Sequence, residues 1–235
     1  MHKKPLVLIT GGTSGLGKCL ATIFIHQNKD LALIARKKDE LTRVKEEFEN
    51  INPNINLYIF DGNIADEEFV KYIYAFIEKK GYFPQYLINC AGIGEFGKAD
   101  SSSKEMINRV FEANLVGLIL MCSNALQHMY MKESYIVNIL STAALRGKAN
   151  ESVYCAAKWG ARGYTEALKK AVENTKIHIL AVYPGGMNTN FWGKEKYNIS
   201  KQNNYMNPQV VEDKIVKKIN SIKKDDNSDL IIERK

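Results

Sequence analysis

A tyrosine and a lysine four residues apart form the pair in this sequence best suited to acid–base chemistry. They are Tyr154 and Lys158. If residues 151–174 form a helix, the two side chains lie on one face, one turn apart. A free phenol has a pKa of about 10, and a nearby ammonium lowers it. The spacing therefore predicts a proton donor and acceptor that works near neutral pH. The alternative is an interior tyrosine beside a surface lysine.

A glycine-rich segment follows the first apolar run of the chain. Residues 6–10 are typical of a strand buried on both faces, and residues 10–17, Thr-Gly-Gly-Thr-Ser-Gly-Leu-Gly, join it to a helical stretch that ends near Asn28. Glycines at this place let the backbone approach a pyrophosphate, and the helix N-terminus offers N–H groups to it. The spacing is neither GxGxxG nor that of a P-loop. Because a strand precedes it and a helix follows, the segment predicts a dinucleotide-binding loop rather than a merely structural turn.

The second predicted strand, residues 31–35, ends in cations. Folds that bind NAD place a carboxylate here for the ribose 2′-hydroxyl, whereas this chain continues with Arg36, Lys37 and Lys38. Arg36, with or without Lys37, suits a 2′-phosphate by charge and by geometry. Thr13 and Ser14 could add hydroxyl contacts. The sequence therefore favours NADP(H) over NAD(H); the alternative is a surface basic cluster at a helix start.

Apolar runs alternate with helical periodicity along the whole chain. The predicted strands are 6–10, 31–35, 55–60, 86–90, 135–140, 177–183 and 230–232, and a long helix capped by Ser101 or Ser102 is predicted to reach residue 131. This order predicts the α/β class: a Rossmann-like, doubly wound parallel sheet of about seven strands with helices on both faces, in a single domain over residues 1–235. Ligands bind such sheets at the carboxyl ends of the strands, and the glycine-rich segment and the basic segment both follow strand ends.

Charge and cysteine usage exclude several classes of function. The net charge is +7, but the lysines are spread along the chain and no nucleic-acid-binding module accompanies them. Four cysteines without a CxxC and four scattered histidines predict neither disulfides nor a metal site. The N-terminal apolar run is too short for a signal peptide, and no segment approaches the length of a transmembrane span. We expect a cytoplasmic protein whose partner is a small molecule, not nucleic acid or a membrane.

Over residues 5–235 the chain resembles the short-chain dehydrogenase/reductase family, because the family's motifs occur in the family's order. They are the glycine loop at 10–17, Asn89-Cys90-Ala91-Gly92, Asn114, Ser141, Tyr154 with Lys158, and Pro184-Gly185 followed by Thr189. The segment 92–97 and Arg36 are most similar to NADP-dependent ketone and ketoacyl-type reductases. The resemblance implies hydride transfer between a nicotinamide and a carbonyl or secondary alcohol substrate.

The resemblance also implies residue roles. Tyr154 would exchange a proton with the substrate oxygen, Ser141 would hold that oxygen, and Asn114 would hold a water that links Lys158 to solvent. Lys158 would lower the pKa of Tyr154 and bind the nicotinamide ribose. The residues implied in cofactor binding are Gly11, Thr13, Ser14, Gly15, Leu16, Gly17, Arg36, Lys37, Asn63, Ile64, Asn89, Ala91, Gly92, Tyr154, Lys158, Pro184, Gly185 and Thr189.

Departures and alternatives remain beside this interpretation. Asn63 stands where the family often has Asp, Cys90 replaces a common Asn, and Asn89 either contacts the cofactor or ties its strand to the neighbouring strands. Cys155 is either an inert core residue or one whose oxidation blocks the site. A non-catalytic nucleotide-binding sensor or scaffold is the alternative function, against which the intact Asn114, Ser141, Tyr154 and Lys158 argue.

The substrate side is predicted from the irregular segment 187–206. We expect its side chains to cover the substrate together with residues from the opposite side: Phe191, Trp192, Tyr197, Tyr205 and Met206, with Phe96, Leu145 and Arg146. Arg146 either pairs with an acidic substrate group or faces water. Helices 103–131 and 151–174 could pair with their copies, so a homodimer or homotetramer is a further hypothesis.

Overall fold

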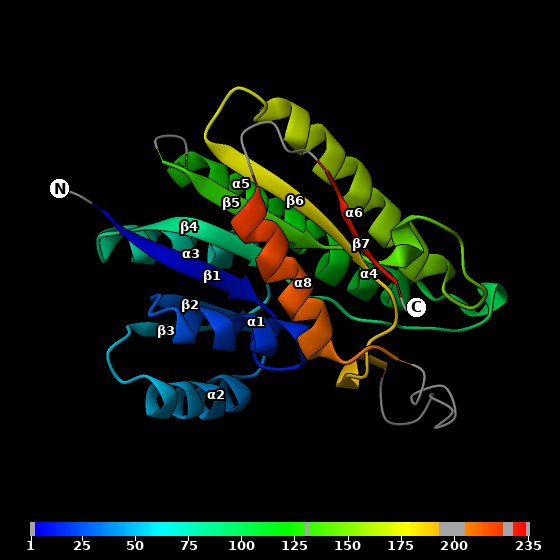
Figure 1. The fold of residues 1–235 in the computed structure, drawn as a ribbon. Coiled ribbons are helices and arrows are strands. Elements are labelled where there is room, and N and C mark those ends of the chain that lie inside the picture. The colour runs from blue at the N-terminus through cyan, green and yellow to red at the C-terminus, as the bar shows by residue number, and fades with distance from the viewer. Residues whose placement is uncertain (1–2, 130–131, 193–204, 223–227, 234–235) are drawn as a thin grey trace.

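A seven-stranded parallel sheet forms the centre of the molecule (Figure 1). The computed structural model describes residues 3–129, 132–192, 205–222 and 228–233. The strand order is β3-β2-β1-β4-β5-β6-β7, so the direction of winding reverses between β1 and β4. The strands are β1 Lys4–Thr10, β2 Leu31–Ala35, β3 Leu57–Asp61, β4 Tyr82–Asn89, β5 Ser134–Ile139, β6 Ile177–Pro184 and β7 Leu230–Ile232. This confirms the predicted fold class and gives the sheet a switch point above β1 and β4.

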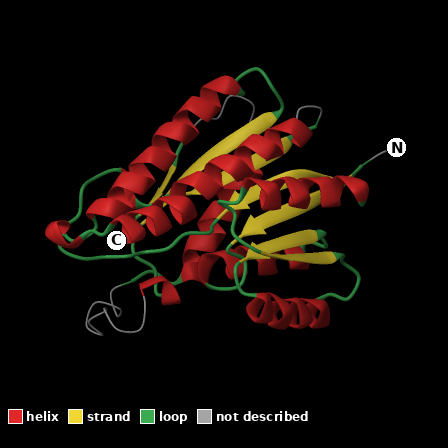
Figure 2. Cartoon of the chain, turned by 180° about the vertical axis from the view of Figure 1, so that it is seen from behind, coloured by secondary structure: helices red, strands yellow, loops and turns green. Residues whose placement is uncertain are grey.

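Helices cover both faces of the sheet. Figure 1 shows α1 (Gly15–His26), α2 (Lys38–Ile51) and α8 (Pro208–Ser221) on the near face. The opposite face, turned forward in Figure 2, carries α3 (Glu67–Lys79), α4 (Lys104–Phe111), α5 (Gly117–Met129) and α6 (Ser152–Ala171). Successive strand residues point to opposite layers: Leu6 and Leu8 pack against one helical layer, and Val7 and Ile9 against the other. Because both layers are apolar, the strands appear in the sequence as continuous apolar runs.

The helix predicted to reach residue 131 from Ser101 or Ser102 is interrupted, and its cap is a different serine. The Oγ of Ser103 accepts the N–H of Met106 at 3.2 Å and begins α4. Ser101 lies in a preceding 3₁₀ turn, η1 (Ala99–Ser101). A π-helical turn, η2 (Glu112–Val116), then separates α4 from α5. Such turns are frequent at functional sites because the extra residue re-aims a side chain, which here is Asn114.

The helical stretch Lys104–Met129 corrects one expectation from the sequence. It spans 26 residues and is long and apolar enough to cross a membrane by length and composition, although no such segment was expected. In this fold the apolar side chains Leu118, Met121 and Ala125 are buried in the cluster between the sheet and its helices. The same composition therefore serves here as a core helix.

A chain of buried polar groups ties α6 to the sheet. Asn89 donates to Asn138 at 2.9 Å, Asn138 donates to Thr165 at 3.0 Å, and Thr165 donates to the carbonyl of Ala161 at 2.7 Å. The chain crosses from β4 through β5 to α6. It supports the structural interpretation of Asn89 and fixes the helix that carries Tyr154.

Candidate active site

Tyr154 and Lys158 lie one turn apart near the start of α6, and both side chains are buried. The Nζ of Lys158 is 5.8 Å from the centroid of the Tyr154 ring. It donates a hydrogen bond of 3.0 Å to the carbonyl of Ile139, at the end of β5. Ser141 follows that strand, and its Oγ accepts the N–H of Ala143 at 3.1 Å. The sheet edge and the helix therefore bring the predicted serine, tyrosine and lysine together.

Burial controls the ionisation of this pair. It raises the pKa of Tyr154, and a hydrogen bond with Ser141 opposes the rise only in part. Burial also lowers the pKa of Lys158 to about 8. The prediction that the pKa of Tyr154 is lowered is therefore wrong for the protein alone. Desolvation penalises the phenolate and the ammonium alike, and it is the largest influence on both pKa values.

Asn114 leaves an acceptor facing the lysine. Its amide nitrogen donates to the carbonyls of Ile93 and Val110, both at 2.9 Å, whereas its buried Oδ1 has no hydrogen-bond partner among the described residues. A Cβ added to Gly92 would lie 2.6 Å from that Oδ1 and 3.8 Å from the Nζ of Lys158. Gly92 therefore keeps open a space that both polar groups border. An orphaned buried acceptor is the environment in which proteins hold a water molecule or a ligand group.

The glycine loop closes against the turn after β4. Gly11 has a φ of +72°, and a Cβ there would lie 2.9 Å from the backbone of Ala91. Gly17 packs so closely on the loop that a Cβ would lie 2.3 Å from the carbonyl oxygen of Gly11. Only glycine permits either arrangement. The hydroxyl of Thr10, which the sequence did not single out, accepts the N–H groups of Cys90 and Ala91 at 3.1 Å and fixes this turn.

Thr189 borders the same loop, and Pro184-Gly185 forms the turn that precedes it in the chain. The methyl group of Thr189 would lie 3.2 Å from a Cβ added to Gly15, so this side chain stands above the glycine loop. The N–H of Gly185 donates to the carbonyl of Ile232 at 2.8 Å, which holds the turn after β6 in place. Ser14 is the N-cap residue of α1, and its side chain makes no capping hydrogen bond.

The basic segment after β2 is exposed, and one of its cations forms an ion pair. Arg36 and Lys37 are both exposed at the end of the strand. Lys37 forms an ion pair of 2.8 Å with Glu40. The other carboxylate oxygen of Glu40 accepts a hydrogen bond of 3.4 Å from the hydroxyl of Thr13. The sequence did not predict a carboxylate beside these cations. A carboxylate is expected at the end of the strand, whereas Glu40 belongs to the first turn of α2.

The remaining residues predicted to bind the cofactor have local structural contacts. Asn63 is exposed, and its Oδ1 accepts the N–H of Ala65 at 3.1 Å. Ile64 and Leu16 are buried, and Ile64 packs so closely on Gly117 that a Cβ there would lie 2.4 Å from it.

Aromatic rings surround the phenol of Tyr154. The ring centroids of Phe96 and Phe191 each lie 5.7 Å from that of Tyr154. Trp192 lies 5.2 Å from Phe96 and stacks on Tyr205 at 5.2 Å. The structure thus places Phe96, Phe191, Trp192 and Tyr205 around the candidate proton donor.

The other residues predicted on the substrate side do not join this group of rings. Arg146 is exposed and pairs with Glu233 at 2.9 Å, so of the two interpretations the structure favours the one in which it faces water. Leu145 packs against the apolar core on the α3–α6 face. Tyr197 lies outside the described residues. Arg109 of α4, which the sequence did not single out, binds Glu95 through two hydrogen bonds of 2.9 Å and holds the loop that carries Phe96.

Two cysteines, Cys90 and Cys155, lie near the site. All four cysteines are free of disulfides. Burial raises the pKa of Cys90 to about 12, so this thiol is not a nucleophile near neutral pH. Cys155 is buried beside Tyr154 in the small cluster that also contains Ala143. Among the described residues no group of three His, Cys, Asp or Glu side chains could hold a metal ion.

Comparison with known proteins now identifies the family. The family model described as short chain dehydrogenase matches residues 5–199. The chain belongs to this family, the short-chain dehydrogenases/reductases. It is therefore an oxidoreductase of the class that acts on carbonyl and alcohol groups.

Individual relatives agree with this assignment. Carbonyl reductase family member 4 of Danio rerio is 28% identical over 184 residues, covering 78% of this chain and 76% of the relative. The 3-oxoacyl-(acyl-carrier-protein) reductase of Rattus norvegicus is 29% identical over 181 residues, covering 77% of this chain and 75% of the relative. An alcohol dehydrogenase from the archaeon Thermococcus sibiricus, solved with 5-hydroxy-NADP, has a TM-score of 0.86 at 20% identity and covers 99% of both chains.

Proposed function

We propose that this protein is an NADP(H)-dependent reductase that interconverts a carbonyl compound and its secondary alcohol, with Tyr154 as the acid and base. The observation that carries the proposal is the buried cluster in which Tyr154, Lys158 and Ser141 meet beside the open acceptor of Asn114. A phenol, an ammonium and a hydroxyl gathered at the carboxyl end of a parallel sheet are suited to proton exchange with a substrate oxygen.

The residues present fit a dinucleotide. The glycine loop approaches Ala91 too closely for any side chain, α1 begins at the end of this loop, and the Oδ1 of Asn114 has no hydrogen-bond partner in the part of the chain that the structure describes. Gly11, Gly15 and Gly17 would hold the pyrophosphate, and Lys158 would hold the nicotinamide ribose. When bound, the nicotinamide supplies or receives the hydride.

The chain's own residues supply the proton and the orientation. Tyr154 gives its phenolic proton to the substrate oxygen during reduction and takes it back during oxidation. Ser141 holds the same oxygen; its Oγ accepts the N–H of Ala143, and its hydroxyl hydrogen can turn from Tyr154 to the substrate oxygen. Asn114 and Lys158 hold a water between them, through which the proton lost by Tyr154 is replaced from solvent.

The surroundings of Tyr154 favour an apolar carbonyl compound. The rings of Phe96 and Phe191, whose centroids lie 6.3 Å apart, both pack on the phenol, and Arg146 pairs with Glu233. The carbonyl substrates in the names of the relatives support this class.

The Tyr154→Phe variant tests the proposal. We expect NADPH to bind as tightly as in the wild-type protein and the rate of carbonyl reduction to fall by roughly 10²- to 10⁴-fold, because only the proton is lost. Binding is measured by titration calorimetry, and turnover by NADPH oxidation across a panel of uncharged ketones and aldehydes. A variant that keeps the wild-type rate would exclude Tyr154 as the proton donor. A wild-type protein that binds NADPH and reduces nothing in a broad panel would favour the nucleotide-sensing alternative.

A further inference from the structure

A carboxylate lies beside the cations that follow β2. Glu40, in the first turn of α2, reaches back between the basic segment and the glycine loop. Its Oε1 accepts from the Nζ of Lys37 at 2.8 Å, and its Oε2 accepts from the Oγ1 of Thr13 at 3.4 Å. The hydrogen bond from Lys37 holds the pKa of Glu40 below its ordinary value, so the group is anionic at neutral pH. One negative charge therefore connects the two segments that were predicted to hold a 2′-phosphate.

The position of Glu40 gives it opposite effects on the two nicotinamide cofactors. A 2′-phosphate near Thr13 and Lys37 would meet a like charge, and Lys37 would have to leave its present partner to bind it. A free ribose 2′-hydroxyl could instead donate a hydrogen bond to the carboxylate, as it does to the strand-end carboxylate of NAD-binding folds. Arg36 forms no ion pair within the described part of the chain, so its charge still favours the phosphate.

We propose that Glu40 is a specificity-determining residue that weakens binding of NADP(H), strengthens binding of NAD(H), and leaves the protein able to use both. This inference rests on the proposed function, because it assumes that the adenosine ribose lies between Thr13 and Arg36. It differs from a purely structural role, in which Glu40 only pairs with Lys37 and supports the start of α2. It also differs from a role in which Glu40 positions Lys37 to hold the phosphate.

The Glu40→Gln variant separates these roles, because it removes the charge and keeps the size of the side chain. Dissociation constants of NADPH, NADH, 2′,5′-ADP and 5′-AMP are measured by titration calorimetry at fixed salt concentration. We expect NADPH and 2′,5′-ADP to bind about 3- to 10-fold tighter, and NADH and 5′-AMP to bind about 2- to 5-fold more weakly. An unchanged ratio of NADPH to NADH affinity would overturn the proposal. Weaker binding of NADPH would overturn it in favour of the role in positioning Lys37.

Glu47→Gln is the matched control, since it removes one carboxylate from the same helix. Glu47 pairs with Lys18 of α1 at 2.7 Å, away from Lys37 and Thr13. We expect the ratio of the NADPH and NADH affinities to change less than about twofold in this variant, because a distant exposed charge is screened by salt. A shift as large as that of Glu40→Gln would show that only the net charge of α2 matters, and would overturn the proposal.

Arg36→Asp tests the underlying cofactor assignment separately. We expect it to weaken binding of 2′,5′-ADP strongly and to leave 5′-AMP nearly unchanged. If Arg36→Asp changes neither, the assignment of NADP(H) fails, whatever Glu40→Gln does. If the wild-type protein binds neither 2′,5′-ADP nor 5′-AMP, both proposals fail. The carbonyl panel reports on catalysis independently, so an inactive protein with the expected affinities would leave the role of Glu40 intact.

Discussion

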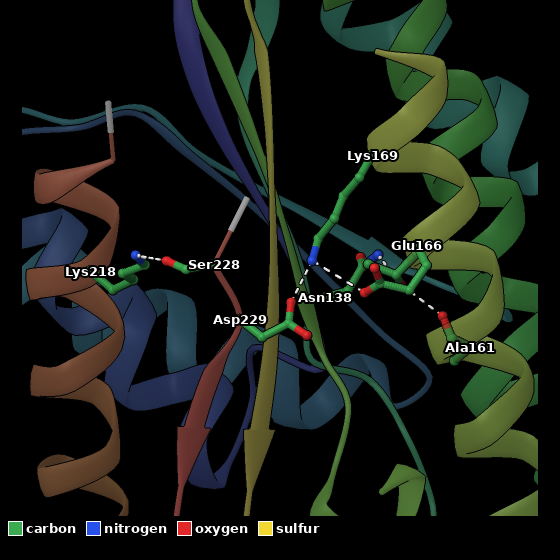
Figure 3. A network of polar contacts seen from close by, with 8 residues as sticks. Asn138, Ala161, Glu166, Lys169, Lys218, Ser228 and Asp229 are labelled. Atoms are coloured by element: carbon green, nitrogen blue, oxygen red, sulfur yellow. Dashed lines mark hydrogen bonds and ion pairs between the residues drawn. The ribbon is translucent and has the colours of Figure 1, made fainter. Parts of the chain in front are cut away.

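Helix α6 buries two lysines in opposite surroundings. Lys158 is 4% exposed and donates to the carbonyl of Ile139, and no carboxylate in the described part of the chain forms an ion pair with it. Lys169 is 6% exposed, and its ammonium contacts Glu166 at 3.2 Å and also Asp229 (Figure 3). Burial is nearly equal, so the partners decide what each lysine does. A compensated charge fastens the helix to β7, and an uncompensated charge remains available for chemistry.

The two buried ammonium groups make opposite contributions to the stability of the fold. Lowering the pKa of Lys158 from 10.5 to about 8 corresponds to about 3 kcal/mol by which burial disfavours its charged form. At Lys169, two carboxylates offset the desolvation of the ammonium, although these carboxylates themselves are largely exposed. The proposed role of Lys158 therefore comes at the expense of stability, whereas Lys169 contributes to stability.

The largest effect is expected from Lys158→Met. We expect carbonyl reduction to fall by roughly 10²- to 10⁴-fold, because the cation beside Tyr154 and the proposed proton path through Asn114 are both lost. The measurement is kcat/KM with NADPH and an uncharged ketone. Lys169→Met is the matched comparison, since it removes an equally buried lysine of the same helix. A loss of similar size in both variants would mean that the helix, and not the ammonium of Lys158, is responsible.

Lys169→Met is expected to reduce stability and to leave activity almost unchanged. It should lower the free energy of unfolding by about 1–2 kcal/mol, because Glu166 and Asp229 lose their shared cation, while their exposure to solvent limits the cost. It should change kcat/KM by less than about threefold at temperatures where the variant is folded, because the ammonium touches no reacting group. Urea unfolding followed by circular dichroism measures the change. A drop below about 1 kcal/mol would place this pair among ordinary surface ion pairs and remove the contrast with Lys158.

The strand positions were predictable because the pattern that reveals them is local. Residues 6–9 and 31–35 are continuous apolar runs, and two-sided burial in a parallel sheet requires such runs. The start of β4 at Tyr82, before the expected residue 86, was not predictable. Pro84 lies in that strand, where the register against β1 shifts between Leu6 and Val7. Proline normally argues against a strand, and only the neighbouring strand shows how the chain accommodates it.

The site was predictable in its members but not in its electrostatics. Tyr154, Lys158 and Ser141 meet as their motifs indicate, because strand ends and helix spacing fix their positions. The raised pKa of Tyr154 follows from burial by segments distant in sequence, among them the rings of Phe96 and Phe191. The contact from Glu40 to Thr13 joins two loops whose closeness no local pattern reveals. Properties that depend on tertiary packing were therefore the ones that the sequence left open.

The smallest predicted effect is the sharpest test of the contrast, because it concerns the stability of Lys158→Met. The folded-state pKa of Lys158, about 8, lies below its ordinary value of 10.5. Between these values the unfolded chain binds more protons than the folded chain, so this residue's contribution to stability rises with pH across that window. At pH 7 its burial is unfavourable, and Lys158→Met should be about 1–2 kcal/mol more stable than the wild-type protein after about 1 kcal/mol is lost at the carbonyl of Ile139.

Above a pH of about 10 the order should reverse, since a neutral lysine still donates to that carbonyl and methionine does not. Urea titrations of both proteins from neutral pH to the ordinary lysine pKa of 10.5 locate the crossing. Lys170→Met, which removes an exposed lysine of the same helix with a side chain 76% accessible, should show no crossing. If Lys158→Met is less stable than the wild-type protein at every pH, the ammonium is compensated after all. The two lysines of α6 would then differ only in which partners they have, and not in whether their charge is offset.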